Sequence, residues 1–241
     1  MEMPKAPINP QKIVVFSGAG ISAESGLKTF RDSNGLWENY PVEVVASING
    51  WRNNPELVLD FYNQRRLDAA NATPNKAHLA IAELEKKFDV VVITQNVDDL
   101  HERAGSSNVI HLHGNLTQAR SSIDPGLIYD IGSAAIHIGQ TCGLKSQLRP
   151  NIVFFGEIPY FLNEAKNHII EAACVLAVGS SLVVEPAASL LKKARFHAAK
   201  TLVTLDVDKV PFGFKLQRGK ATELVPYFCQ RWLSAGKFTN T

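Results

Sequence analysis

The hydrophobic pattern of the chain is dominated by six short apolar runs, each followed by a glycine or a polar residue. The runs cover residues 12–16, 89–94, 109–112, 151–155, 174–178 and 201–205. Strands of a parallel sheet are buried on both faces and therefore read as continuous apolar stretches. The pattern predicts six buried strands of this kind.

Stretches with apolar residues at helical spacing separate several of these runs. Asn54-Pro55 opens one stretch and Pro74-Asn75 opens another, as capping residues do where helices start. Further helices are expected over residues 186–199 and 223–233. Strands that alternate with helices predict an α/β fold built on a doubly wound parallel sheet.

The segment from residue 118 to residue 149 departs from this pattern. It is polar, rich in glycine and serine, and weakly periodic. Long segments without clear elements are uncommon inside a compact domain. We interpret this one as an inserted module between two core elements.

Composition limits the class of protein. The chain has 241 residues, 45% of them hydrophobic, and a formal charge of +2. This nearly even balance of charges argues against a nucleic acid or a charged membrane surface as a partner. The three cysteines, Cys142, Cys174 and Cys229, are too few and too widely spaced for a disulfide scaffold. No signal peptide or membrane span is recognisable, so we expect a soluble cytoplasmic monomer.

Two glycine turns follow predicted strands. Gly18 and Gly20 follow the first run, and Gly179, Ser180 and Ser181 follow the fifth. Glycine lets the backbone approach a pyrophosphate, and a helix start offers amide donors. Ordinary strand-to-helix turns would use the same residues. An acidic residue that reads the ribose is expected further on, and Glu38 and Asp206 are both candidates.

Polar side chains also gather where two other strands end. Gln95, Asn96 and Asp98 follow the run at 89–94, at the sheet edge where ligands bind in such folds. The same residue types also cap helices. Alternation places His111 and His113 on one face of the next strand, where a histidine serves either as a general base or as a buried structural group.

These motifs, taken together and in order, resemble those of the sirtuin family over residues 12–233. They are Gly18-Ala19-Gly20-Ile21-Ser22, Gly26-Leu27-Lys28-Thr29-Phe30-Arg31, Gly35-Leu36-Trp37, Thr94-Gln95-Asn96-Val97-Asp98, His113-Gly114, Val153-Phe154-Phe155-Gly156-Glu157 and Gly179-Ser180-Ser181-Leu182. The resemblance implies a Rossmann-type domain with a smaller domain formed by insertions. The first would comprise residues 1–28, 75–116 and 149–241, and the second residues 29–74 and 117–148. It also implies NAD-dependent removal of acyl groups from protein lysines, with release of nicotinamide and an O-acyl-ADP-ribose.

The resemblance also implies residue roles. His113 would be the general base, with Asn96 as a second catalytic residue in the nicotinamide pocket. Val153, Phe155, Gly156 and Glu157 would bind the substrate peptide by strand addition. The cofactor contacts would come from Gly18, Ala19, Gly20, Ser22, Phe30, Arg31, Gln95, Asn96, Asp98, Gly179, Ser180, Ser181, Asp206 and Ala221.

A narrower resemblance concerns the acyl group. Ala46, Tyr62 and Arg65 are similar to the acyl pocket of the bacterial CobB-like class, which removes succinyl and malonyl groups. Tyr62 and Arg65 are three residues apart and would share a helix face, where a hydroxyl and a guanidinium can hold a carboxylate. Without the resemblance, Arg65 would be interpreted as a surface cation near Asp68.

The chain departs from the family at the zinc module. Ser121, Asp124 and Gly139 occupy three of the four cysteine positions, and only Cys142 remains. Structural zinc requires four closed ligands, mostly thiolates, so no bound metal is expected. Apolar packing is expected to replace it, through Ile123, Leu127, Ile128, Tyr129, Ile131, Ile136 and Ile138.

Two other functions are consistent with the same motifs. One is a mono-ADP-ribosyltransferase, which begins with the same cleavage of nicotinamide. The other is a non-catalytic sensor of NAD or ADP-ribose, against which the presence of His113 and Asn96 argues. A dehydrogenase is disfavoured because no separate catalytic domain follows the Rossmann-type part.

Overall fold

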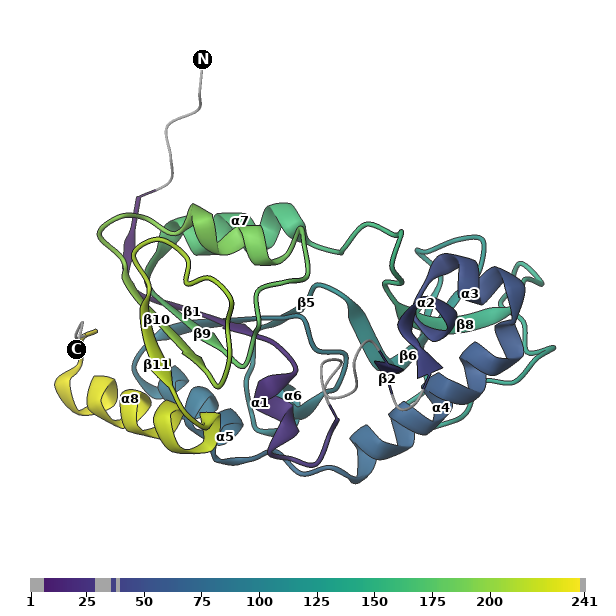
Figure 1. Cartoon of the computed structure of the whole chain (residues 1–241), viewed down its shortest axis with the longest axis horizontal. Helices are drawn as coiled ribbons and strands as arrows, with labels where there is room; N and C mark the ends of the chain where they lie inside the picture. Colours follow the sequence, from purple (N-terminus) through teal and green to yellow (C-terminus); the bar gives the residue numbers. More distant parts are fainter. Residues whose placement is uncertain (1–6, 29–35, 38–39, 239–241) are drawn as a thin grey trace, which may run out of the picture.

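A computed structural model describes residues 7–28, 36–37 and 40–238. In these residues a six-stranded sheet lies beside a smaller domain (Figure 1). The strand order is β11-β10-β9-β1-β4-β5, and all neighbours are parallel. The strands are β1 (Asn9–Ser17), β4 (Asp89–Thr94), β5 (Val109–His111), β9 (Ala172–Val178), β10 (Ala199–Thr204) and β11 (Lys215–Arg218). The predicted α/β fold with a doubly wound parallel sheet is confirmed.

Helices cover both faces of this sheet, which explains its apolar runs. Ile13 and Val15 of β1 pack toward one face, while Val14 and Phe16 pack toward the other. The first face carries α5 (Lys76–Glu83), the 3₁₀ turn η1 (Leu84–Lys86) and α8 (Ala221–Ala235), and the second carries α7 (Leu162–Glu171) and the 3₁₀ helix η2 (Ala188–Lys193). Figure 1 shows α7 above the sheet and α5 and α8 below it.

The predicted helix starts are present. The side-chain oxygen of Asn54 accepts a hydrogen bond from the Leu57 amide at 3.1 Å and caps α4 (Pro55–Asn71). Asn75 caps α5 in the same way, through the Ala77 amide at 2.9 Å. The last predicted helix corresponds to α8. In the described part of the chain, no helix combines the length and apolarity needed to cross a bilayer.

Two element predictions were wrong. The helix expected over residues 186–199 is only the short 3₁₀ helix η2, because the chain must turn back to enter β10 at Ala199. The strand expected over residues 151–155 is instead β8 (Leu148–Ile152). The apolar residue Phe154 after β8 is explained by packing rather than by a strand, because it is buried against the smaller domain.

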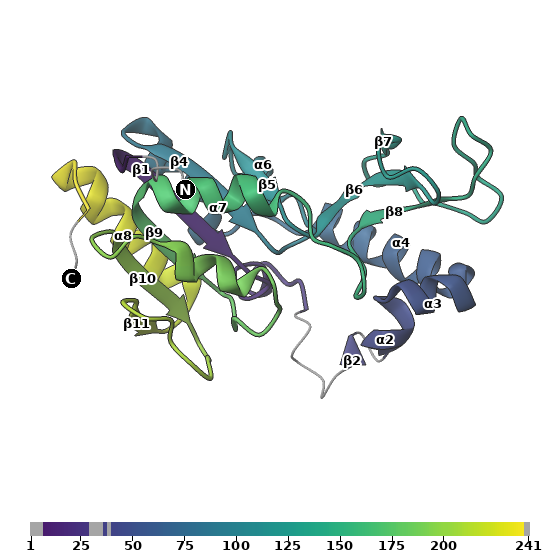
Figure 2. The ribbon, with the colours of Figure 1, turned by 90° about the horizontal axis from the view of Figure 1, so that it is seen from above.

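The smaller domain joins two segments that are distant in the sequence. Its elements are β2 (Leu36–Trp37), β3 (Tyr40–Pro41), α2 (Val42–Val45), α3 (Ile48–Asn53), α4, β6 (Gly114–Ser121), β7 (Ile128–Asp130) and β8. One cluster packs Tyr62 and Phe61 of α4 against Leu116 of β6 and Phe154. Figure 2 shows β6, β7 and β8 beside α3 and α4, away from α8. α4 is thereby fixed to the segment that follows β8.

The apolar packing expected within residues 118–149 was wrong for most of its residues. Ile123, Ile128 and Ile138 are 68%, 46% and 53% exposed, and only Ile136 of the predicted set is buried. Antiparallel pairing of β6 with β7 and β8 orders the segment instead. The hairpins are too short to cover their own apolar side chains.

Candidate active site

A cavity of about 1070 Å³ lies between the smaller domain and the ends of the central strands. Its lining includes residues that follow β1, β4 and β9, together with Tyr62 and Arg65 of α4. β1 and β9 are neighbours, but the sheet continues from β1 to β4 on one side and from β9 to β10 on the other. The cavity therefore opens at the switch point of the sheet, where doubly wound folds bind ligands.

The two glycine turns lie against each other at this point. The Gly20 amide donates to the Gly179 carbonyl oxygen at 2.8 Å. A Cβ atom on Gly20 would lie 2.7 Å from that oxygen, and one on Gly18 would lie 2.9 Å from the Cα of Ser180. Only glycine permits this approach.

The predicted helix start after the first turn is present, but the helix is short. α1 (Gly20–Ala23) is a single turn, and the Gly20, Ile21 and Ser22 amides already donate to carbonyl oxygens of the protein. The expected amide cradle of a longer helix start is therefore reduced. The turn contributes close backbone approach rather than a set of open donors.

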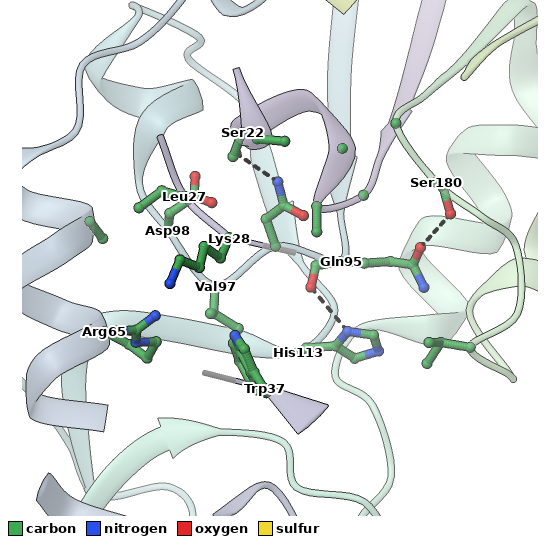
Figure 3. Close-up of a pocket in the computed structure, with 18 of the residues that line it drawn as sticks. Ser22, Leu27, Lys28, Trp37, Arg65, Gln95, Val97, Asp98, His113 and Ser180 are labelled. Atoms are coloured by element: carbon green, nitrogen blue, oxygen red, sulfur yellow. Dashed lines mark hydrogen bonds between the residues drawn. The ribbon is translucent and has the colours of Figure 1, made fainter. Parts of the chain in front are cut away.

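Polar side chains connect the turns to the end of β4 (Figure 3). Ser180 Oγ donates to Gln95 Oε1 at 2.9 Å, and Asn96 Nδ2 donates to Ser22 Oγ at 3.0 Å. Asn96 is buried, and its Oδ1 atom has no hydrogen-bond partner among the described residues. A buried acceptor without a partner is costly unless a ligand supplies a donor. Asn96 therefore fits a ligand that carries an N–H group.

Asp98 lies beside this amide at the base of the cavity. Its side chain is buried and accepts a hydrogen bond from the Leu100 amide at 3.2 Å. Burial raises the pKa of the Asp98 carboxyl, although the Leu100 amide and Ser22 hydroxyl oppose the shift. A buried carboxyl and an unsatisfied amide oxygen together suit a primary carboxamide, as nicotinamide carries.

His113 has the geometry of a general base. Its Nδ1 atom lies 3.1 Å from the carbonyl oxygen of Gln95, which can only accept a hydrogen bond (Figure 3). In the neutral ring Nδ1 therefore carries the hydrogen, and Nε2 presents a lone pair. Burial lowers the pKa of His113, so the neutral form dominates at neutral pH.

His111 has a different role, although it is only two residues away. Its Nδ1 donates to the Asn96 carbonyl oxygen at 3.0 Å, and its Nε2 lies 2.7 Å from Glu102 Oε1. Burial opposes charge on this ring, but the Glu102 carboxylate and the Asn96 carbonyl raise its pKa overall. His111 is thus a structural residue that holds the Asn96 backbone in place.

The residues predicted to form an acyl pocket, Ala46, Tyr62 and Arg65, all line the cavity. Tyr62 is buried, and its ring packs against Phe154 with centroids 5.6 Å apart. Arg65 forms an ion pair with Asp68 at 2.5 Å, and its side chain is only 13% exposed. The alternative interpretation of Arg65 as a cation near Asp68 is thus correct in the partner, but the side chain is enclosed rather than at the surface. Ala46 lines the same cavity.

The segment from Val153 to Glu157 is held firmly in position. The Val153 amide donates to the His113 carbonyl oxygen at 2.9 Å, and the Phe155 amide donates to the Ala46 carbonyl oxygen at 2.8 Å. Arg149 donates to both carboxylate oxygens of Glu157, and Arg120 donates to one. The Glu157 charge therefore anchors the segment. A peptide would have to pair with backbone groups other than the Val153 and Phe155 amides, which are already bonded.

The remaining predicted residues divide into two groups. Ala19, Gly156, Ser181, Asp206 and Ala221 all line the cavity. Phe30, Arg31 and Glu38 lie outside the described residues. Sequence reasoning missed Lys28, Gln64 and Asp68 as lining residues. Only Asp68 carried a signal, because it stands three positions after Arg65 on a predicted helix.

The residues at the zinc-module positions do not fit a structural zinc ion. Ser121 Oγ accepts hydrogen bonds from the Ile123 and Asp124 amides at 3.2 and 3.1 Å and bonds to Ser146 Oγ. Hydrogen bonds from Ser121 and Ser146 lower the pKa of Cys142 to about 7. One thiolate is still not the four-ligand set that structural zinc needs. Over the described ranges, no three His, Cys, Asp or Glu side chains form a metal-binding group.

Comparison with known proteins gives a consistent family signal. Residues 18–186 match the Sir2 family. A protein of Helicobacter pylori strain 26695, named NAD-dependent protein deacylase, is 54% identical over 188 residues, which are 78% of this chain and 82% of that protein. A protein of the same name from Pasteurella multocida is 46% identical over 92% of this chain and 98% of its own length.

Solved structures give the same signal at the level of the fold. A Sir2 homologue in complex with NAD superposes with a TM-score of 0.82 at 38% identity, covering 94% of this chain and 91% of that one. A Sir2 homologue mutant in complex with ADP ribose superposes with a TM-score of 0.83 at 38% identity, covering 93% of both chains.

Proposed function

This chain belongs to the Sir2 family, and from that membership we propose that its cleft catalyses NAD-dependent removal of acyl groups from lysine side chains of proteins. One structural observation carries the proposal. The unpartnered Asn96 oxygen, the buried Asp98 carboxyl and the Nε2 lone pair of His113 belong to residues that line one cavity. The first two suit a carboxamide, and the third suits removal of a proton from a ribose hydroxyl.

The chain's own residues are suited to bind NAD. Gly18 and Gly20 allow the two glycine turns to meet, and they line the cavity that would hold the cofactor, as Asp206 and Ala221 also do. NAD would supply there a ribose carbon that can bond to the acyl oxygen of the substrate, with nicotinamide as the leaving group. Asn96 and Asp98 orient the leaving carboxamide, and orientation of this kind lowers the barrier without added chemistry.

His113 acts in the following step. Its Nε2 takes a proton from a ribose hydroxyl, which requires a neutral ring at the pH of the reaction. The hydrogen bond from Nδ1 to the Gln95 carbonyl oxygen fixes the ring in the right tautomer, and the hydrogen bond that Ser180 Oγ donates to Gln95 Oε1 anchors Gln95. Removal of the base is expected to slow turnover by about 10²–10⁴-fold.

The acyl pocket extends the proposal to acidic acyl groups. Tyr62 and Arg65 lie one turn apart on α4, and both line the cavity. A guanidinium recognises carboxylates through paired N–H donors. We therefore propose that the enzyme removes succinyl and malonyl groups as well as acetyl groups.

The experiment that tests the function is a product analysis. Protein, NAD and an acetyl- or succinyl-lysine peptide are incubated, and all products are identified by mass spectrometry. A deacylase yields free lysine peptide, nicotinamide and O-acyl-ADP-ribose. ADP-ribose attached to protein or peptide would indicate a transferase, and unchanged NAD would indicate a sensor.

A matched pair of variants controls this experiment. His113→Ala removes the proposed base, whereas His197→Ala removes an exposed histidine outside the cavity lining. Only the first should abolish product formation. Full activity of His113→Ala would contradict the proposed mechanism.

Partners and location follow as proposals from the same function. Acylated lysines of proteins are the substrates, whereas no nucleic acid or membrane is required, and the chain acts as a monomer. Cys142, Cys174 and Cys229 are free thiols and are buried. Free cysteines suit a reducing compartment, which supports a cytoplasmic location. Size-exclusion chromatography with light scattering would test the monomer.

A further inference from the structure

The acyl end of the cavity contains a carboxylate of the protein itself. Asp68 Oδ2 lies 2.5 Å from Arg65 Nη2, and both residues line the cavity. Resting on the deacylase function proposed above, we propose that Asp68 sets the acyl preference of the enzyme. It occupies the guanidinium that would otherwise bind a substrate carboxylate.

Asp68 is held in a defined position. Its other oxygen, Oδ1, accepts a hydrogen bond from Gln64 Nε2 at 2.8 Å. Arg65 also contacts Phe61, because its guanidinium carbon lies 5.7 Å from the centroid of the Phe61 ring. The four residues lie within two turns of α4, so the pair does not depend on a mobile loop. An ion pair anchored in this way persists in the free protein.

The pair affects neutral and acidic acyl groups differently. Arg65 is only 13% exposed, and a cation so enclosed is costly without an anion beside it. Asp68 supplies that anion when an acetyl group occupies the pocket. An acyl chain that ends in a carboxylate brings a second anion to the same guanidinium, and like charges at such distances repel.

A substrate carboxylate must therefore share Arg65 with Asp68 or displace it. A guanidinium binds a carboxylate best through two parallel N–H donors, and Asp68 engages one of its terminal nitrogens. The presence of Asp68 lowers the affinity for succinyl-lysine relative to acetyl-lysine. Loss of its charge should shift the preference toward the acidic group.

The test compares kcat/KM for acetyl- and succinyl-lysine peptides in wild-type protein and Asp68→Asn. Asparagine keeps the size of the side chain and its bond to Gln64 but removes the charge. The succinyl-to-acetyl ratio should rise about fivefold or more, which corresponds to the upper range for an exposed ion pair. The rise should come mainly from a lower KM for the succinyl peptide, because the reacting groups are unchanged.

Three further variants make the comparison specific. Asp60→Asn makes the same charge change on α4, at an exposed position outside the cavity lining, and should leave the ratio unchanged. Asp68→Glu restores a carboxylate and should return the ratio toward the wild-type value. In an Arg65→Met background, Asp68→Asn should no longer alter the ratio.

Several outcomes would overturn the inference. A lower ratio in Asp68→Asn would show that Asp68 positions Arg65 for the substrate rather than competing with it. An unchanged ratio, with both activities present, would remove Asp68 from acyl selection while leaving the deacylase function intact. If wild-type protein removes neither group, the proposed function fails and the inference fails with it. Should Asp68→Asn not fold, Asp68→Ser removes the same charge and tests the same ratio.

Discussion

The Nδ1 atom of His113 lies 3.1 Å from the carbonyl oxygen of Gln95, so the backbone after β4 determines which nitrogen of this ring is basic. His111 contacts the next carbonyl, that of Asn96, and also lies beside the Glu102 carboxylate, which raises its pKa. Adjacent carbonyl groups thus orient two rings whose pKa values are shifted in opposite directions. This arrangement connects the end of β4 directly to the chemistry of the cleft.

A first prediction concerns the pH dependence of activity. Burial lowers the pKa of His113, and the reaction needs its neutral form. The midpoint of the acid limb in the pH profile of kcat/KM should therefore lie below the ordinary histidine pKa of about 6.5. A pH series from 4.5 to 8 in saturating NAD measures it. A midpoint above pH 7 would mean that the protonation of another group limits the rate.

A second prediction concerns stability in acid. Burial lowers the pKa of His78 to about 4 and that of His101 well below its usual value. The unfolded chain binds protons at these sites near pH 6.5, but the folded chain does not. Between about pH 6.5 and pH 4, stability should therefore fall as pH falls, by about 3 kcal/mol from His78 alone.

His111 acts in the opposite direction, because its raised pKa stabilises the fold below its ordinary pKa and this contribution is lost as pH rises. Urea unfolding at several pH values measures the sum. His78→Gln should flatten the curve while keeping the cap, since glutamine suits the third position of α5, where His78 accepts from the Asn75 amide. An unchanged slope in this variant would contradict the assignment.

A third prediction concerns the contact between the two glycine turns. Gly20→Ala places a Cβ atom 2.7 Å from the Gly179 carbonyl oxygen, so the turns must separate. The melting temperature should fall and NAD affinity should weaken together. Gly143→Ala is the control, because its Cβ atom would meet nothing closer than 3.9 Å. Calorimetric titration with NAD alone measures the affinity, and wild-type binding by Gly20→Ala would exclude the close contact.

The sequence predicts much of this fold because the relevant signals are local. Ile13 to Phe16 are apolar on both strand faces, and Asn54 and Asn75 cap helices through bonds to nearby amides. The short η2 and the exposed Ile123 were not predictable, because distant segments decide whether a turn continues or a side chain is covered. Family motifs located His113 and Asn96, and the spacing on the helix placed Asp68 near Arg65. That this pair lines the cavity was not predictable, because it depends on how α4 packs against distant segments.

A fourth prediction concerns the module at residues 118–149. Ser121 accepts two backbone amides, so Ser121→Ala leaves them without an acceptor and should cost about 1–3 kcal/mol. Ser122→Ala is the matched control at an exposed neighbour. The protein should contain no zinc, and a chelator should leave its melting temperature and activity unchanged. Equimolar zinc in untagged protein, with inactivation by the chelator, would contradict this.

The last prediction concerns Arg65, whose charge has a function only if the acyl group is acidic. Arg65→Met keeps an apolar chain of similar length beside Phe61 and removes the guanidinium. A charge-assisted hydrogen bond contributes about 1.5–3 kcal/mol, so the succinyl-to-acetyl ratio of kcat/KM should fall by about tenfold or more. The same substitution leaves Asp68 without its cation, and acetyl turnover should change far less because the acetyl group has no carboxylate. Arg52→Met, at an exposed position in α3, removes one positive charge without touching the cavity and should leave the ratio unchanged. Equal loss on both peptides would assign Arg65 to the fold of α4 rather than to the substrate, and melting curves of both variants distinguish these outcomes.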